Sequence, residues 1–174
     1  MGQPNSDLPL DGITVVALEQ AVAAPLATRH LADMGARVIK IERVGEGDFA
    51  RHYDQAVHGQ ASHFVWLNRS KESIAVDVKS EAGRQILLDL VARADVFLQN
   101  LAPDAAARLG FGAEELRDKY PRLIVIDMSG YGSAGPRRER RPRSMVVEVC
   151  GLTFPLLRSN ASCVCENGPS APAW

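Results

Sequence analysis

The first residues with a chemical signature are the small ones that stand before a proline. The segment EQAVAAP at 19–25 follows an apolar run at 13–18, and Pro25 suits the first turn of a helix. Backbone N–H groups and the helix dipole at such a start can receive an anion. The same small residues would also let a helix pack closely on a sheet, and the loop alone favours this structural interpretation. It lacks the G-x-G-x-x-G fingerprint, and the chain has no P-loop, which argues against an ordinary NAD or ATP site.

The cysteines and histidines predict neither a disulfide framework nor a metal site. Cys150, Cys163 and Cys165 all lie in the last 25 residues, and their number is odd. The four histidines lie far from them, between His30 and His63, so four zinc ligands are not brought together by the sequence. We therefore expect no metal and no resident cofactor.

The overall charge limits the classes of partner. A net charge of −1 gives no general attraction to nucleic acid or to an acidic membrane, so a local basic cluster must hold any anionic ligand. No apolar run approaches the ~18 residues that a membrane span needs. The first residues show no basic segment followed by an apolar stretch, as a secretory signal would. We expect a cytoplasmic protein without a nucleic-acid or membrane partner.

Short apolar runs alternate with amphipathic stretches along the first 126 residues. Expected strands lie at 13–18, 37–42, 74–78, 95–98 and 123–126. Expected helices lie at 25–34, 80–94, 103–109 and 112–120, with one short helix near 64–67 inside a long loop at 43–73. This alternation predicts an α/β domain with a mainly parallel sheet flanked by helices.

Apolar spacing predicts which helix faces are buried. Ala27, Leu31 and Met34 form the expected face of the first helix, which Gly35 ends. In the helix that Ser80 caps, the expected buried residues are Ile86, Leu87, Leu90, Val91 and Ala94.

The sequence changes character after Pro136. Five arginines occupy seven positions at 137–143, and the alternation of strands and helices stops. Such a run can mark a nuclear signal or a nucleic-acid arm, although a solvated charge cluster is commoner. We favour a break in the reading frame near 137–144. The expected organisation is one domain over 8–141 and an aberrant tail over 142–174, either frameshifted or disordered.

Many separated motifs together resemble the N-terminal half of the class III CoA-transferases, the CaiB/BaiF family. These motifs are LDGITVV at 10–16, GARVIKIER at 35–43, GEGD at 45–48, NRSKESI at 68–74, DVK at 77–79, ADVFLQN at 94–100, RLGF at 108–111, PRLI at 121–124 and SGYG at 129–132. The resemblance covers about 8–141 and implies a Rossmann-like fold, incomplete relative to the family, that binds coenzyme A or acyl-CoA as a substrate.

The resemblance also implies which residues bind CoA. The pantetheine and thioester would lie beside Gln20, Ala21, Val22 and Ala23. The nucleotide would lie among Arg43, Val76, Lys79, Asn100, Leu101, Arg108 and Leu109, with Arg141 at the edge of the site. Arg and Lys form charge-assisted hydrogen bonds to phosphate, and Val76 and Leu109 are suited to covering an adenine.

Several of these residues also have a simpler interpretation. Lys79 and Arg108 could be solvated surface charges. Asn100 could cap the helix near Pro103, and Arg43 could pair with Glu46 or Asp48.

The catalytic residues that the family uses are not found in this sequence. The resemblance implies a nucleophilic aspartate about thirty residues beyond Arg141, but no aspartate follows Asp127. Racemase relatives use a His/Asp pair, but no histidine follows His63. We expect a truncated, inactive CoA-transferase that retains CoA binding at most and cannot form the interlocked homodimer of the family. A member like α-methylacyl-CoA racemase and a non-catalytic CoA- or nucleotide-binding module are the alternatives.

Overall fold

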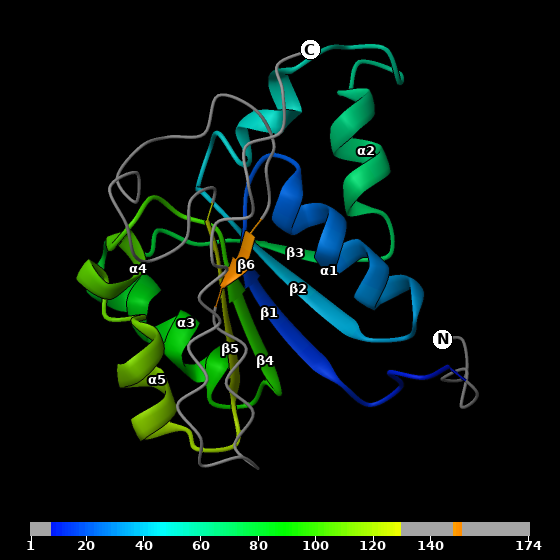
Figure 1. The fold of residues 1–174 in the computed structure, drawn as a ribbon. Helices are drawn as coiled ribbons and strands as arrows, with labels where there is room; N and C mark the ends of the chain where they lie inside the picture. Colours follow the sequence, from blue (N-terminus) through cyan, green and yellow to red (C-terminus); the bar gives the residue numbers. More distant parts are fainter. Residues whose placement is uncertain (1–7, 130–147, 151–174) are drawn as a thin grey trace, which may run out of the picture.

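The structure of the 174-residue chain is a computed structural model (Figure 1). The structure describes residues 8–129 and the backbone of residues 148–150. The predicted tail over 142–174 and Arg141 therefore lie outside the described residues, apart from the short strand at 148–150. In the described part, no helix combines the length and apolar character needed to cross a membrane.

Six strands form one sheet in the order β3-β2-β1-β4-β5-β6. The strands are β1 (Thr14–Leu18), β2 (Arg37–Glu42), β3 (Glu72–Ala75), β4 (Val96–Gln99), β5 (Ile124–Ser129) and β6 (Glu148–Cys150). The first five are parallel to their neighbours, and β6 pairs antiparallel with β5. The prediction of an α/β fold with a mainly parallel sheet is confirmed.

Helices cover both faces of the sheet (Figure 1). They are α1 (Ala23–Asp33), the 3-10 helix η1 (Phe49–His52), α2 (Ser62–Asn68), α3 (Glu81–Val91), α4 (Ala105–Arg108) and α5 (Ala113–Lys119). α1 and α2 lie on one side of the sheet, and α3, α4 and α5 lie on the other. Successive residues along each strand point alternately to the two helix layers, so both faces of the sheet are buried.

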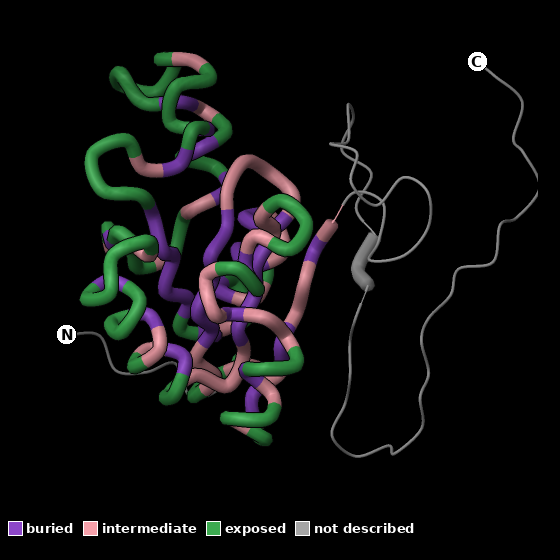
Figure 2. The backbone as a smooth tube through the Cα atoms, turned by 90° about the vertical axis from the view of Figure 1, so that its left-hand side faces the viewer, coloured by how far each residue is buried: buried purple, intermediate pink, exposed green. Residues whose placement is uncertain are grey.

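The two apolar layers follow from this alternation along the strands. Val16, Ile39 and Phe97 pack in the larger cluster with α3 and α5. Val15 and Val38 pack in a second cluster with α1. Figure 2 shows the buried strands in purple at the centre and the exposed loops in green around them. At about 1.5–3 kcal/mol for each large apolar side chain, this burial is the main force that holds the sheet and helices together.

The expected helix faces were only partly right. Met34 is 40% exposed and Ile86 is 45% exposed, so both assignments to a buried face were wrong. Met34 lies beyond the end of α1, and the small residues Ala24, Thr28 and Ala32 are buried on that helix in its place. A small-residue face lets α1 approach the sheet closely, whereas hydrophobic spacing alone selects the larger side chains.

The segment over 43–73 contains more structure than expected. It holds η1 as well as the predicted short helix, which is α2. The third strand also ends at Ala75, earlier than the expected 74–78, although Val76 N still donates to Glu42 O at 2.9 Å. The apolar alternation at 74–78 therefore continues beyond the end of β3.

Candidate functional site

The residues predicted to bind a ligand follow the strands at one edge of the sheet. The loop 19–22 follows β1, Arg43 follows β2, residues 76–79 follow β3, and Asn100 follows β4. Because these strands are parallel, their carboxyl ends meet at the same edge. β1 has β2 on one side and β4 on the other. The chain adds β2 and β3 on the first side and then crosses to β4, so the strand order reverses at β1. Ligands of open parallel sheets bind at such a reversal.

Asn100 joins the two loops at the reversal. Its Oδ1 accepts a hydrogen bond from Gln20 N, and its Nδ2 donates one to Gln20 O, both at 2.9 Å. The alternative that Asn100 caps a helix near Pro103 was wrong, because Asp104 is the N-cap of α4. Arg43 Nη2 donates to Gln20 Oε1 at 3.4 Å. Three of the predicted residues, which follow three different strands, are therefore in contact.

Ala21 turns the chain from β1 into α1. Its φ of 66° lies in the left-handed region, which costs a non-glycine residue about 1–2 kcal/mol. Val22 is the N-cap of α1 but makes no side-chain cap, and the first turn has no acidic residue. The positive end of the α1 dipole therefore has no counter-charge in its own first turn and lies at the carboxyl edge of the sheet.

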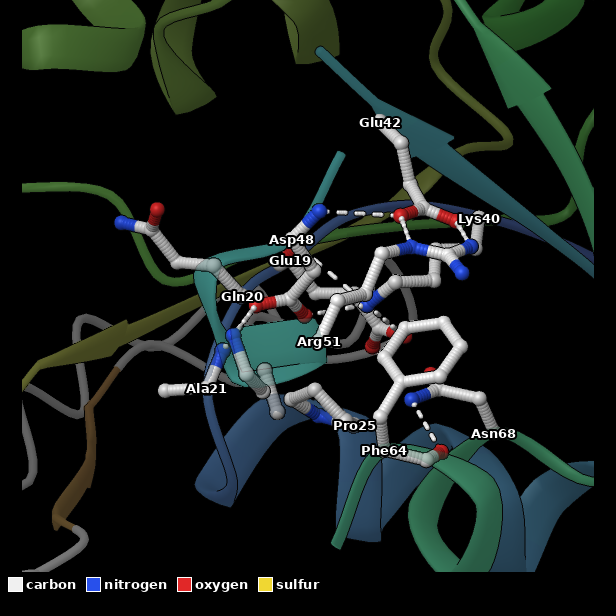
Figure 3. A network of polar contacts seen from close by, with 12 residues as sticks. Glu19, Gln20, Ala21, Pro25, Lys40, Glu42, Asp48, Arg51, Phe64 and Asn68 are labelled. Atoms are coloured by element: carbon white, nitrogen blue, oxygen red, sulfur yellow. Dashed lines mark hydrogen bonds and ion pairs between the residues drawn. The ribbon is translucent and has the colours of Figure 1, made fainter. Parts of the chain in front are cut away.

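Beneath this loop lies a group of buried charges that sequence reasoning missed (Figure 3). Lys40 Nζ lies 2.9 Å from Asp48 Oδ2 and 3.4 Å from Glu19 Oε1, and Lys71 Nζ lies 2.7 Å from the same Glu19 oxygen. Each of the four side chains is 2% exposed or less. Two carboxylates and two ammonium groups balance in charge, which is how buried ions are tolerated.

We call this group of Glu19, Lys40, Asp48 and Lys71 the buried charge cluster. Its charged side chains also form hydrogen bonds to uncharged groups. Thr28 Oγ1 donates to Glu19 Oε2 at 2.6 Å. Lys71 Nζ also donates to Pro25 O and to Asn68 Oδ1, at 2.9 and 3.1 Å. Burial lowers the pKa of Lys71 below its usual value, and the charge of Glu19 opposes this. One sequence signal was available: Lys40 interrupts the buried run VIKI at 38–41, where a charge needs a partner.

Glu42 makes a second ion pair beside the cluster. Its Oε2 accepts from Arg51 Nε at 2.8 Å and from Asp48 N at 2.9 Å, while Oε1 accepts from Arg51 Nη2 at 2.8 Å and from Ser73 Oγ at 2.6 Å. Burial alone would raise the pKa of Glu42, but these hydrogen bonds outweigh it and lower that pKa to about 2. Arg51 also lies over the Phe64 ring, 3.8 Å from its centroid (Figure 3).

The depressed pKa of Glu42 predicts part of the acid sensitivity of the fold. A carboxyl whose pKa falls from 4.5 to about 2 on folding stabilises the fold fully above 4.5, and this contribution is lost as the pH falls through about 2. We expect Glu42→Gln to cost about 2 kcal/mol near pH 7, allowing for screening at the exposed Arg51, and progressively less below pH 4.5.

Urea unfolding between about pH 7 and pH 3 measures this difference. Glu114→Gln, which changes an exposed carboxylate on α5, is the matched control and should stay within about 0.5 kcal/mol of wild type. A cost for Glu42→Gln that does not vary with pH would contradict the assignment.

The remaining predicted residues lie around α3 and α4. Lys79 is exposed just before α3, and Arg108 is exposed in the last turn of α4. A Cβ at Gly110 would collide with the guanidinium of Arg84, so the end of α4 lies against the first part of α3. Arg84 is thus a further exposed basic residue in this region that the sequence did not single out. Arg84 thus lies close to the end of α4, and Lys79 stands just before the helix that carries Arg84.

The apolar members of the predicted set belong to the core as well as to the edge. Val76 is 6% exposed and lies in the larger core cluster, against which Leu101 and Leu109 also pack. Contact of Val76 or Leu109 with an adenine stays a prediction. Sequence reasoning identified these positions through the resemblance, because periodicity alone would have assigned them only to the core.

Comparisons with known proteins agree on one family. The model of CoA-transferase family III matches residues 10–153. The acetyl-CoA:oxalate CoA-transferase of Acetobacter aceti is 44% identical over 128 residues, which are 74% of this chain and 33% of that protein. The human succinyl-CoA:glutarate CoA-transferase is 38% identical over 157 residues, which are 87% of this chain and 36% of that protein.

Solved structures show the same similarity. The crystal structure of a CaiB/BaiF family protein from Brucella suis has a TM-score of 0.73 and 38% identity, covering 77% of this chain and 36% of that one. The chain thus spans about a third of the length of the relatives it matches. The matched range of the family model ends at 153, which is beyond the expected domain boundary at 141.

Proposed function

The chain belongs to CoA-transferase family III, and on that premise we propose that it provides the CoA-binding part of an enzyme that moves coenzyme A between an acyl-CoA and a carboxylic acid. Both curated relatives are named for such a transfer. The observation that carries the proposal is the loop 20–23 at the reversal of strand order, linked to Asn100 and Arg43.

The pantetheine arm and thioester lie along this loop in the proposed complex. Asn100 binds the backbone of Gln20 and Asp48 binds that of Ala21, and the N-terminus of α1, whose first turn has no acidic residue, follows directly. Such a terminus favours a partial negative charge, including the one that develops on a thioester carbonyl oxygen. The loop therefore supplies positioning and electrostatic stabilisation, whereas the covalent steps require a nucleophile from elsewhere.

The nucleotide lies toward α3 and α4 in the same complex. CoA carries a 3′-phosphate and a diphosphate, and Arg43, Lys79 and Arg108 offer exposed cations along that part of the edge. Each contact would be a charge-assisted hydrogen bond, worth about 1.5–3 kcal/mol. The net charge of the chain is only −1, so this local grouping rather than an overall field must attract the phosphates.

We expect Lys79→Ala and Arg108→Ala each to raise the Kd for CoA about tenfold, because each removes one contact to phosphate. Isothermal titration calorimetry at low and at physiological ionic strength measures the effect, which should shrink as salt screens the phosphates. Arg93→Ala and Arg122→Ala are the matched controls, since both remove an exposed arginine near the opposite edge of the sheet. Equal losses in all four variants would contradict the proposed position of the nucleotide.

The 174-residue chain by itself is proposed to bind CoA without transferring it. A transfer through an enzyme-bound thioester needs a carboxylate nucleophile, and no aspartate follows Asp127 in this sequence. Incubation with succinyl-CoA and a free dicarboxylic acid should therefore yield no new CoA thioester. Turnover would show that another carboxylate of this chain performs the reaction.

The oligomeric state of the 174-residue chain can be tested directly. Several large apolar side chains between residues 44 and 66 are exposed, among them Phe49 at 46% and Trp66 at 49%. We expect the 174-residue chain not to form the interlocked homodimer of the family, and size-exclusion chromatography with light scattering measures its molar mass directly.

A further inference from the structure

One carboxylate beneath the edge of the sheet reaches the loop that is proposed to hold the thioester arm. Asp48 Oδ1 accepts hydrogen bonds from Ala21 N and from Ala50 N, both at 3.0 Å. Its Oδ2 accepts from Lys40 Nζ at 2.9 Å. The Asp48 side chain is fully buried, so it touches neither solvent nor a ligand on the surface. Its direct contact with the loop 20–23 is the hydrogen bond from the backbone N–H of Ala21.

The geometry makes this contact a constraint on the loop. Ala21 has a φ of 66°, a conformation that alanine adopts only when its surroundings compensate for the cost. The hydrogen bond from Ala21 N to a charged acceptor provides that compensation, because bonds to ionised groups are stronger than neutral ones. Asp48 itself cannot follow a moving loop, since its N–H is bound to Glu42 and its carboxylate to Lys40.

A second anchor acts on the neighbouring peptide group. Asn100 binds both the N–H and the carbonyl of Gln20, and Glu19 is held in the buried charge cluster. Asn100 on one side and Asp48 on the other thus determine how the Gln20 side chain and the start of α1 face the edge of the sheet. Of these groups, Asp48 is the one that acts on the left-handed residue itself.

We propose that Asp48 is a positioning residue that keeps the loop 20–23 in the conformation that binds the thioester arm of an acyl-CoA. This inference rests on the proposed function, because it assigns the loop to that arm. It assigns no contact between Asp48 and the substrate. Of the proposed nucleotide contacts, Lys79 and Arg108 lie at α3 and α4, whereas Arg43 is linked to the loop through Gln20.

The test uses Asp48→Asn and compares two ligands by calorimetry. Acetyl-CoA has the thioester arm, whereas adenosine 3′,5′-diphosphate carries the nucleotide without it. We expect the variant to bind acetyl-CoA about tenfold more weakly and the nucleotide within about twofold of wild type. In hydrogen–deuterium exchange, the Ala21 amide of the variant should exchange about tenfold faster than that of wild type. This measurement reports the loss of the hydrogen bond to Asp48 without any ligand.

Asp54→Asn is the matched control, because Asp54 also accepts from two backbone N–H groups, but these belong to Ala56 and Ser62 and not to the loop 20–23. It should leave both affinities and the Ala21 exchange unchanged. Ala21→Val serves where Asp48→Asn does not fold, since a β-branched residue opposes a positive φ without altering a buried charge. It should show the same selective loss of acetyl-CoA binding.

Equal weakening of both ligands would overturn the proposal, because it would show a general structural role. Unchanged binding of acetyl-CoA with faster Ala21 exchange would also overturn it, because the loop would then not hold the arm. Should the wild-type chain bind neither ligand, the proposed function fails, while a change in Ala21 exchange would still show that Asp48 holds the loop.

Discussion

Replacing Lys40 by methionine is expected to destabilise the fold by about 3–5 kcal/mol, the usual cost of removing one partner from a buried ion pair. Lys40 is 1% exposed, and its ammonium group is bound to Asp48 and Glu19. Methionine fills a similar volume, so the loss would report the charge rather than a cavity. Lys71 remains beside Glu19, but Asp48 would lose its only ion-pair partner among the described residues.

Urea unfolding at neutral pH measures this loss, with Lys119→Met on the surface of α5 as the control. The double variant Lys40→Met, Asp48→Asn removes both charges and should recover part of the stability, as a double-mutant cycle would show. A loss below about 1 kcal/mol would mean that water or a rearranged side chain can replace the ammonium group.

Gly83→Ala is expected to destabilise the fold by at least about 2 kcal/mol, although this substitution usually stabilises a helix by about 0.5–1 kcal/mol. Gly83 lies in the first turn of α3, where its N–H binds Ser80 Oγ at 3.0 Å. A Cβ there would collide with the carbonyl oxygen of Asp77, which is backbone and has little freedom to move. The clash would therefore displace the turn that carries Lys79.

Thermal and urea unfolding of Gly83→Ala give the sign of the effect. Ala82→Gly, at the exposed neighbouring position, is the control and should cost at most about 1 kcal/mol through helix propensity. An increase in stability for Gly83→Ala would show that the turn at 77–80 yields without cost and that the close approach of α3 is not required.

The strands and the class of fold could be predicted because their signals are local. The apolar runs at 13–18 and 37–42 are almost entirely buried strands in the structure, and the Ser80 cap of α3 is present as expected. Helix faces were less predictable, because an apolar stripe spans a wide arc and packing decides which part meets the sheet. Ile86 and Leu87 are adjacent and equally apolar, yet only Leu87 is buried.

The candidate site divides in the same way. The positions of Gln20, Arg43, Lys79, Asn100 and Arg108 came from motifs in the sequence, and parallel strands place the first four after their carboxyl ends. The contacts among them could not be predicted, because Gln20 and Asn100 are 80 residues apart in the chain. The same holds for the pairing of Lys71 with Glu19 across 52 residues.

The sequence by itself determined the strand-helix alternation, the family and the residues that stand at the sheet edge, since each of these depends on neighbours along the chain. Only the tertiary structure decided that Lys40, Glu19, Asp48 and Lys71 meet in one buried cluster and that Asp48 reaches Ala21. Such contacts depend on the order of strands and on how closely α1 and α2 approach the sheet. A charge in a buried strand indicates that a partner must exist, but only the fold identifies it.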